Sequence, residues 1–431
     1  PTIVAVRLVV AMLLGRLAGR LSRLVGRGGS AVPGLVAEAV DPRVIEKLSA
    51  RIPDGVVVVT GTNGKTTTTK MLTSILERAG HRVIANTTGS NLVRGIATRL
   101  IEVAGLRSGI EGDLAVFEVD EAALRVLAPR VRPRLVVVTN LARDQLDRFG
   151  ELLTTAGHIE SALAHSGAAV LNADDELVAG LADGTDLAVR HYGAVEEIRA
   201  AMPSDAALYA DEEPRPHGRN LDVVLTAAVP AGDGVRIGLV ADGTEVGAAL
   251  RVPGAYNGYN AAAATSAARA LGVDLDTAPP ALEAMPPAFG RGQVIPYRDR
   301  NVRLLLVKNP AGFNQAIRLL GSAEPAPVLV VINDRDADGR DVSWLWDARV
   351  EDLAGTAHRF GASGIRAADM GLRFKYAGVE AWVEDDVGAA LDRAVADAPE
   401  GGDIHVVPTY TAMLEVLHLL LPDTARRETW T

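Results

Sequence analysis

The stretch that decides the fold reads Thr60-Gly61-Thr62-Asn63-Gly64-Lys65-Thr66-Thr67. A β-branched run at residues 56–60 predicts a strand before it, and residues 65–79 have the pattern of a helix. A glycine-rich turn in this position lets backbone amides approach a polyphosphate, and the helix N-terminus adds partial positive charge. Lys65 can reach the β- and γ-phosphates, and the Thr66 hydroxyl can ligate Mg²⁺. The stretch therefore predicts an ATP site in preference to a turn with an incidental lysine.

Short apolar runs alternate with helical stretches on the C-terminal side of this turn. Further strands are expected near residues 83–86, 114–120, 135–140 and 168–171. Such alternation predicts a parallel sheet that is covered by helices on both faces. Between about residues 194 and 253 the pattern changes to short strands separated by Gly-Asp turns, which predicts a small β insertion.

A second α/β unit follows a proline-rich boundary at residues 279–287, with strands expected near residues 304–307, 328–332 and 404–407. A chain of 431 residues is too long for one hydrophobic core. We therefore expect an α/β protein with three parts. These are an N-terminal helical segment (1–52), a central ATP-binding parallel-sheet domain (53–290) and a C-terminal Rossmann-like domain (291–431).

Bulk composition excludes several classes of function. The net charge of −10 argues against a nucleic-acid partner, which requires a basic surface. The chain has no cysteine, so it can form no disulfide, no thiolate zinc site and no cysteine nucleophile. This composition is compatible with a reducing, cytoplasmic location.

The first residues require a test for membrane segments. Residues 1–14 are apolar, but Arg7 interrupts them, and the remaining run is shorter than the about 20 residues that span a bilayer. The order of charge, apolar core and cleavage site found in a signal peptide is missing. We expect an amphipathic helix packed on the first domain. Weak contact with a membrane surface through the arginines is the alternative.

The turn is shorter than the general phosphate-loop spacing, and it resembles the ATP loop of the Mur ligase and folylpolyglutamate synthase superfamily. Other motifs resemble the same superfamily: Phe117-Glu118-Val119-Asp120, Thr139-Asn140, Asp144-Gln145-Leu146-Asp147-Arg148, Asn172-Ala173-Asp174-Asp175, Gly254 with Asn257 and Asn260, and Gly290-Arg291.

This resemblance implies a role for each motif. ATP would be held by Gly61, Thr62, Asn63, Gly64, Lys65, Thr66 and Thr67. Thr66 and Glu118 would hold Mg²⁺, one of Asn257 and Asn260 would reach the adenine, and Arg291 would approach the phosphates.

The C-terminal half narrows the resemblance to one family. Residues 308–314, residues 333–344, residues 143–150 and the arginine-rich N-terminal helix resemble the Mur-ligase-like subunit of lipid II isoglutaminyl synthase. That family amidates the α-carboxylate of D-glutamate in the lipid II stem peptide through an acyl phosphate. The resemblance implies ATP and Mg²⁺ as cofactors, with Lys65 and Glu118 in catalysis. It also implies a lipid II substrate, and hence a peripheral position at the inner face of the plasma membrane.

The resemblance also implies a partner, a class I glutaminase subunit of the GatD type, in a heterodimer. Such a glutaminase needs a cysteine nucleophile, which this chain cannot supply. In the family the ligase subunit lends an aspartate to the partner's Cys-His pair, and the matching residue here is Asp341. Spacing alone would make Asp341 an ordinary residue of an acidic turn.

Two features depart from most relatives. Four cysteines that form a zinc ribbon in many members are absent around residues 200–225, so we predict no zinc site, and we expect His217 to be a surface residue. The histidine near the second Mg²⁺ of amino-acid ligases is Gln145 here, and whether one or two ions bind stays open.

Alternatives to the amidating ligase are an amino-acid-adding Mur ligase, a folylpolyglutamate synthase-like ligase, and a nucleotide-dependent switch. A GTP-dependent switch would carry Asn-Lys-x-Asp, which Asn140-Leu141-Ala142-Arg143 lacks. Among lesser candidates, Trp344 and Trp346 either face a partner or lie in a core. Asn86 and Asn91 either contact substrate or cap the next helix.

Overall fold

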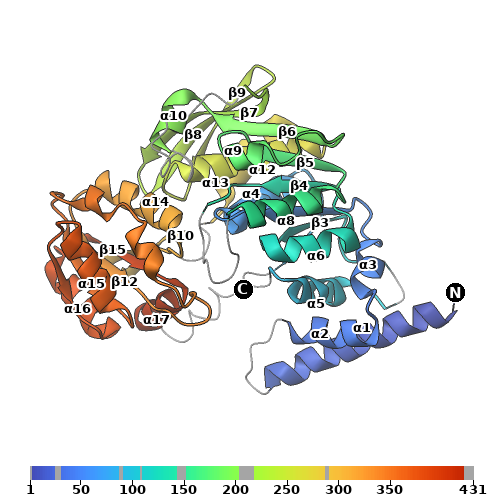
Figure 1. Cartoon of the computed structure of the whole chain (residues 1–431), viewed down its shortest axis with the longest axis horizontal. Helices are drawn as coiled ribbons and strands as arrows, with labels where there is room; N and C mark the ends of the chain where they lie inside the picture. The colour runs from blue at the N-terminus through green and yellow to red at the C-terminus, as the bar shows by residue number, and fades with distance from the viewer. Residues whose placement is uncertain are drawn as a thin grey trace.

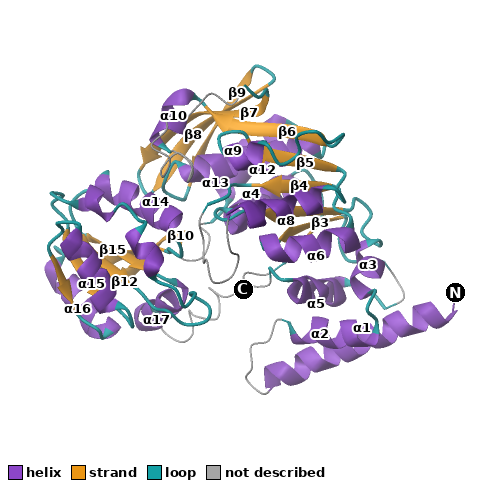
Figure 2. Ribbon diagram, in the orientation of Figure 1, coloured by secondary structure: helices purple, strands orange, loops and turns teal. Residues whose placement is uncertain are grey.

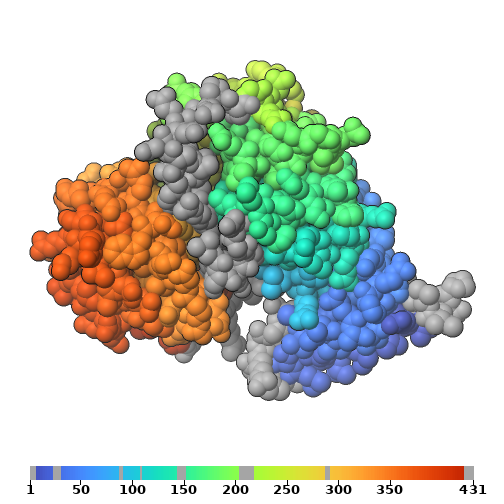
Figure 3. Space-filling model, viewed as in Figure 1, coloured from blue at the N-terminus to red at the C-terminus, as the bar shows by residue number. Residues whose placement is uncertain are grey.

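The computed structural model describes residues 2–24, 31–86, 91–106, 109–142, 152–202, 218–286 and 291–421. Its elements follow one another along the chain as N-terminal helices, a central α/β region and a C-terminal α/β lobe (Figure 1). The C-terminal lobe lies beside the central region and is seen as a separate orange mass in the space-filling view (Figure 3).

Three helices open the chain: α1 (Thr2–Leu24), α2 (Val32–Val40) and α3 (Val44–Ser49). α1 packs closely on α2, because Gly15 and Gly19 both face Pro33. A Cβ atom at Gly15 would lie 2.9 Å from the Pro33 carbonyl oxygen, and one at Gly19 would lie 2.9 Å from Pro33 Cγ. α1 therefore lies along the margin of the molecule, with α2 against its inner face (Figure 1).

Within the described residues the central sheet has nine strands in the order β2-β3-β1-β4-β5-β6-β7-β8-β9. The strands from β2 to β7 pair in parallel, as expected. They are β1 (Val56–Thr60), β2 (Val83–Ala85), β3 (Leu114–Glu118), β4 (Leu135–Val138), β5 (Ala168–Asn172), β6 (Ala188–Ala194) and β7 (Leu221–Ala231). Their carboxyl ends meet at one edge, which brings the motifs after β1, β3, β4 and β5 together.

Helices cover both faces of this sheet (Figure 2). Successive residues of β1 point to opposite faces, so that Val56 and Val58 join one core while Val57 and Val59 join the other. The first core includes α5 (Val93–Val103), α6 (Glu121–Val131) and α8 (Leu152–Leu163). The second includes α4 (Lys65–Arg78), α12 (Tyr256–Ala270) and α13 (Ala278–Ala284). Shorter helices are α9 (Glu176–Ala179), α10 (Glu196–Ala201) and η1 (Leu275–Thr277).

The strands expected between residues 194 and 253 extend the same sheet. β7 pairs with β8 (Gly234–Ala241), and β8 pairs with β9 (Thr244–Leu250), in both cases antiparallel. Because β6 pairs with β7 in parallel, these strands continue the central sheet without a break.

The described part of the C-terminal lobe has a six-stranded sheet in the order β10-β11-β15-β12-β13-β14. Only β10 runs antiparallel to its neighbour. The strands are β10 (Arg291–Tyr297), β11 (Arg300–Leu305), β12 (Pro327–Val331), β13 (Arg359–Ser363), β14 (Ala381–Val383) and β15 (Asp403–Pro408). The helices are α14 (Pro310–Gly321), η2 (Ser343–Trp346), η3 (Val350–Leu353), α15 (Ala367–Tyr376), α16 (Val387–Asp397) and α17 (Tyr410–Leu420). The predicted fold class, an α/β protein with a second Rossmann-like α/β unit, is confirmed.

Direct contacts join the lobe to the central sheet. The Arg303 guanidinium on β11 forms an ion pair with Asp233 in the turn between β7 and β8. A Cβ atom at Gly292 would lie 2.3 Å from Pro253 Cδ, so β10 passes tightly over the segment before α12. No helix in the described ranges is both long enough and apolar enough to cross a bilayer.

Candidate active site

The turn between β1 and α4 has the geometry of a phosphate loop. Gly61 and Gly64 have φ angles of 116° and 85°, in the left-handed region that favours glycine. Both are also enclosed: a Cβ atom at Gly61 would lie 2.3 Å from Thr139 Oγ1, and one at Gly64 would lie 2.2 Å from Asn260 Oδ1. The strand-turn-helix context expected from the sequence is therefore present, with the loop pressed between two neighbouring segments.

The segment after β4 holds the loop in place. Asn140 accepts from the Asn63 amide through its side-chain oxygen at 3.0 Å, and its backbone oxygen accepts from the Thr62 amide at 2.8 Å. Thr139 Oγ1 and Asn140 Nδ2 donate to the Asn63 carbonyl at 2.7 and 2.9 Å. Thr139 and Asn140, quoted above only for their resemblance, thus fix the loop's backbone.

Lys65, the first residue of α4, is almost fully buried. Its ammonium group donates to the Gly61 carbonyl at 2.5 Å and lies 2.9 Å from Glu121 Oε1. Glu121 is 3% exposed, and it begins α6 directly after β3. Sequence reasoning missed Glu121, which lies three residues after Glu118, the last residue of β3.

Glu118 ends β3 opposite Val59 of β1, which places it one step from the loop. Asn86 fixes its backbone, donating from Nδ2 to the Glu118 carbonyl and accepting from the Glu118 amide, both at 2.9 Å. The interpretation of Asn86 as a substrate contact or a cap missed this role. The carboxylate of Glu118 and the hydroxyl of Thr66 are donors of the kind that Mg²⁺ takes alongside nucleotide phosphates. No cluster of three or more His, Cys, Asp or Glu side chains that could hold a metal ion occurs in the described ranges.

A second carboxyl lies beside Glu121. Asp120 caps the start of α6 by accepting from the Ala122 amide at 3.2 Å. Burial raises the pKa of the Asp120 carboxyl, and the neighbouring charge of Glu121 raises it further. Lys65 opposes this shift, so one ammonium group serves two neighbouring acids.

The start of α12 packs on the phosphate loop. Asn257 and Asn260 are both buried, and Asn260 Nδ2 donates to Asn257 Oδ1 at 3.0 Å. Asn257 Nδ2 donates to the Pro253 carbonyl at 2.7 Å, while Asn260 Oδ1 accepts from Thr68 Oγ1 at 3.3 Å. In this structure the two asparagines join α12 to α4, and their expected contact with an adenine stays a prediction.

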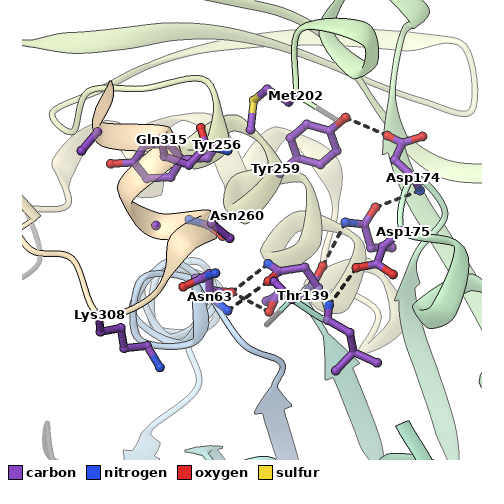
Figure 4. A pocket seen from close by; sticks show the side chains of 18 of the residues that line it. Asn63, Thr139, Asp174, Asp175, Met202, Tyr256, Tyr259, Asn260, Lys308 and Gln315 are labelled. Atoms are coloured by element: carbon purple, nitrogen blue, oxygen red, sulfur yellow. Dashed lines mark hydrogen bonds between the residues drawn. The ribbon is translucent and has the colours of Figure 1, made fainter. Parts of the chain in front are cut away.

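A cavity of about 210 Å³ adjoins the loop, with walls from the central domain and the C-terminal lobe. Asn63 and Lys308 lie at one end, and Met202, Tyr256 and Tyr259 lie toward the other (Figure 4). The cavity therefore runs from the phosphate loop to an aromatic wall, an arrangement suited to a nucleotide's phosphates and base.

The motif at the end of β5 joins this strand to the segment after β4 and to α12 along this cavity. Asn172 Nδ2 donates to the Thr139 carbonyl at 2.9 Å, and Asp175 accepts from the Leu141 amide at 2.7 Å. Tyr259 donates its hydroxyl to Asp174 Oδ2 at 2.9 Å (Figure 4). Burial raises the pKa of the Tyr259 phenol, and the Asp174 charge adds to the shift, so this phenol stays protonated and remains a donor.

The C-terminal lobe reaches the loop through Asn309, which is fully buried. Asn309 Oδ1 caps α14 by accepting from the Gly312 amide at 2.8 Å, and its Nδ2 donates to Asn63 Oδ1 at 3.2 Å. Arg291 is the first residue of β10; the structure describes its backbone but not its side chain, and its contact with phosphates stays a prediction.

Asp341 does not line this cavity; it lies in the C-terminal lobe just before η2. Its carboxylate accepts from the Ser343 amide at 2.8 Å and from the Ser343 hydroxyl at 2.9 Å. The loop that carries it is anchored by Asp338, which accepts from the Thr411 amide at 2.6 Å at the start of α17. Asp341 is therefore held by its own turn, and it is half-buried.

The two tryptophans after Asp341 have different environments. Trp344 is buried, edge-on to Phe313 with ring centroids 6.1 Å apart, so it belongs to the core. Trp346, the last residue of η2, is 49% exposed. Its ring centroid lies 5.5 Å from that of Tyr376. Residues 143–150 with Gln145, Gly290 and His217 lie outside the described residues.

Two models of known protein families match this chain. A family model described as "Mur ligase middle domain" matches residues 59–268, and one described as "MurT ligase C-terminal" matches residues 306–413.

Individual relatives extend over nearly the whole chain. The MurT subunit of lipid II isoglutaminyl synthase (glutamine-hydrolyzing) from Streptococcus pneumoniae is 33% identical, covering 94% of this chain and 96% of the relative. The subunit of the same name from Staphylococcus aureus is 30% identical over 95% of this chain and 97% of the relative. The MurF ligase from Thermotoga maritima, in complex with ADP, has the same fold, with a TM-score of 0.69 at 16% identity and coverage of 91% and 85% of the two chains.

Proposed function

Because this chain belongs to the MurT family of Mur-ligase-like subunits, we propose that it is the ligase subunit of a lipid II isoglutaminyl synthase. It is an ATP-dependent carbon–nitrogen ligase that acts in peptidoglycan synthesis. Its substrate is the α-carboxylate of D-glutamate in the lipid II stem peptide, and its product is D-isoglutamine. The observation that carries the proposal is a phosphate loop of the Mur ligase type in one chain with a MurT-type C-terminal lobe.

The reaction has two steps whose atoms balance. A carboxylate oxygen attacks the γ-phosphorus of ATP, the bond to the β-phosphate oxygen breaks, and ADP leaves. Ammonia then attacks the acyl carbon, phosphate leaves with the bonding electrons, and a proton is lost from nitrogen. Phosphoryl transfer of this kind is accelerated mainly by positioning and by electrostatic stabilisation.

The residues of the loop fit the first step. The backbone amides of Gly61 to Thr67 cradle the triphosphate, and Lys65 offsets charge on the transferring group. Thr66 and Glu118 are the side chains that would hold Mg²⁺, which neutralises phosphate charge when bound. The base and ribose occupy the cavity between Tyr256, Tyr259 and the C-terminal lobe.

Glu121 has a preparatory role in this scheme. Its carboxylate holds the Lys65 ammonium group at the mouth of the loop before ATP arrives. The triphosphate then replaces Glu121 as the partner of Lys65, wholly or in part.

Ammonia comes from a partner, because the chain has no cysteine nucleophile of its own. We propose a class I glutaminase subunit of the GatD type, bound as a heterodimer at the surface that carries Asp341. Asp341 orients and stabilises the imidazolium of the partner's histidine. The exposed Trp346, five residues after the half-buried Asp341, supports this, since tryptophan is enriched at interface anchors.

The lipid-linked substrate implies that the chain works in the cytoplasm at the inner face of the plasma membrane. The test is reconstitution of the purified chain with its candidate glutaminase, glutamine, ATP and lipid II, followed by mass analysis of the stem peptide. Conversion of one carboxylate to an amide supports the proposal. Addition of an amino acid, without need for the glutaminase, would establish the peptide-forming alternative instead.

A further inference from the structure

α1 is apolar on the face that points away from the protein as well as on the face that packs. Leu8, Ala11 and Met12 are buried against the rest of the protein, and Gly15 and Gly19 give close contact with α2. The packing of α1 on the rest of the protein therefore does not use the residues on its opposite side. A helix that is apolar all round is normally covered on all sides.

The uncovered side carries a continuous stripe of large aliphatic side chains. Each is between 40% and 59% exposed: Val6, Val10, Leu13, Leu14, Leu17 and Leu21. At about 100° per residue these six positions fall within an arc of about 100° on one side of the helix. No comparable run of exposed apolar residues occurs on any other helix in the described part of the chain.

Positive charge borders this stripe on both sides. Arg7 and Arg20, both exposed, fall just outside its two edges by the same spacing. Arg16 lies farther round and anchors the helix, donating to the Ile101 carbonyl at 2.7 Å at the end of α5. The sequence of α1 contains no aspartate or glutamate, although the chain as a whole has a net charge of −10.

We propose that this outward face of α1 is a docking surface for an anionic lipid bilayer. The aliphatic stripe enters the boundary between headgroups and acyl chains, while Arg7 and Arg20 remain at the level of the headgroup phosphates. The helix lies in the plane of the membrane and does not cross it, in keeping with the absence of a spanning helix from the described residues.

The charges favour a lipid surface over a second copy of the chain. Two α1 stripes packed on each other would bring arginines against arginines at both borders, with no acid on α1 to offset them. An anionic bilayer supplies the opposite charge at the border and an apolar medium at the centre. The surface would serve the proposed function, but its test is independent of that function because it uses neither ATP nor lipid II.

The test is co-sedimentation of the full chain with vesicles of equal parts phosphatidylcholine and phosphatidylglycerol, compared with vesicles of phosphatidylcholine alone. The chain should bind the anionic vesicles, and binding should weaken with added salt. The double variant Leu13→Glu with Leu17→Glu should bind at least about tenfold less. Arg20→Glu should lose affinity for the anionic vesicles only.

Two controls keep the result interpretable. Val229→Glu changes an equally exposed aliphatic residue on β7, an element at the opposite end of the molecule from α1 in Figure 1, and should bind vesicles as the unmodified chain does. The double variant Leu17→Ser with Leu21→Ser makes part of the stripe polar without adding charge. It takes the place of the double glutamate variant if that protein does not fold.

Equal sedimentation of the unmodified chain and both stripe variants would overturn the proposal. So would a chain that ignores both kinds of vesicle yet forms a dimer in solution that the stripe variants abolish. Retained nucleotide binding in the stripe variants would separate a loss of docking from a loss of the active site.

Discussion

The ammonium group of Lys65 lies 2.9 Å from Glu121 Oε1, and both side chains are less than 10% exposed. Isolated charges at this depth are costly, so each requires the other while no nucleotide is bound. The pair joins the first residue of α4 to the first residue of α6, and thus sets the position of the cation before a triphosphate enters. When ATP binds, its triphosphate therefore replaces the Glu121 carboxylate as the anion paired with Lys65.

Glu121→Gln should destabilise the nucleotide-free protein by about 3 kcal/mol, because it removes the carboxylate that is paired with a buried ammonium group. A non-hydrolysable ATP analogue should then raise the melting temperature more in this variant than in the unmodified chain, since the triphosphate restores the missing negative charge. Thermal unfolding with and without the analogue measures both effects. Glu160→Gln, at an exposed position on α8, is the matched control. Identical melting curves for the two variants would contradict the exchange.

Lys65→Ala should reduce amidation by about 10²-fold or more, the usual effect of removing a group that stabilises developing charge. The glutaminase should still co-purify, because Lys65 is buried and so is not part of the surface proposed to bind the partner. Lys70→Ala removes an exposed lysine from the same helix and should leave turnover unchanged. Unchanged turnover in Lys65→Ala would refute the assigned role.

Gly64→Ala should abolish nucleotide binding. The added Cβ atom would lie 2.2 Å from Asn260 Oδ1, so either α12 or the loop must move. Gly80→Ala is a matched control, because Gly80 also has a positive φ angle, of 97°, but has no atom within 4 Å of the added carbon. The control should lose only about 1 kcal/mol of stability, from backbone strain alone. Calorimetric titration with the ATP analogue compares the two, and tight binding by Gly64→Ala would show that the loop can adjust.

Asp341→Asn should reduce glutamine-dependent amidation by about 10⁴-fold, as the same change of a triad carboxylate does elsewhere. Amidation supported by an ammonium salt should persist, because the ATP site is intact. This pair of assays separates a role in the partner's triad from general damage. Asp336→Asn, in an exposed residue of the same loop, should affect neither assay. If Asp341→Asn loses amidation equally with glutamine and with the ammonium salt, Asp341 has a structural role only.

His405 on β15 should make the C-terminal lobe sensitive to acid. Burial and the nearby Arg303 charge lower the pKa of its imidazole from 6.5 to about 4. Below pH 6.5 the unfolded chain therefore takes up a proton that the folded chain refuses until about pH 4, so stability is lost as pH falls through this window. The loss should be about 2 kcal/mol between about pH 7 and pH 5.

This loss can be followed by denaturant titration with tryptophan fluorescence, because every tryptophan of the chain lies after residue 291. His405→Gln should remove that part of the pH dependence, whereas His418→Gln, at an exposed position on α17, should retain it. An equal slope in His405→Gln and the unmodified chain would show that another group is responsible.

The phosphate loop could be predicted because its information is local. The glycines, the lysine and the flanking periodicities all lie between residues 56 and 79, and each has a direct physical meaning. Glu118 was found through the family resemblance, and the pairing of β1 with β3 then places it next to the strand that leads into the loop. Glu121 was missed because its contact with Lys65 depends on how α6 leaves β3, which no short pattern encodes.

Some strands were missed because their sequences lack β-branched runs. β10 contains Gly292 and Pro296, yet it forms, because it is an edge strand and tolerates the missing donor. β13 contains Gly361, where a Cβ atom would lie 2.3 Å from the Trp382 ring. Its glycine makes room for a neighbouring aromatic residue, a tertiary requirement that is invisible locally. The outward stripe of α1 was hidden in a similar way, because composition shows apolar residues but not which of them stay uncovered.

The side-chain amide of Asn309 makes two separate hydrogen bonds, one through its oxygen and one through its nitrogen. The oxygen begins α14 within its own lobe, and the nitrogen reaches across to Asn63. If the lobe swings outward to admit a nucleotide, the second bond can break while the first survives. α14 would then move as a rigid body with its first turn intact. The Asn309 amide could bind Asn63 again when the lobe returns.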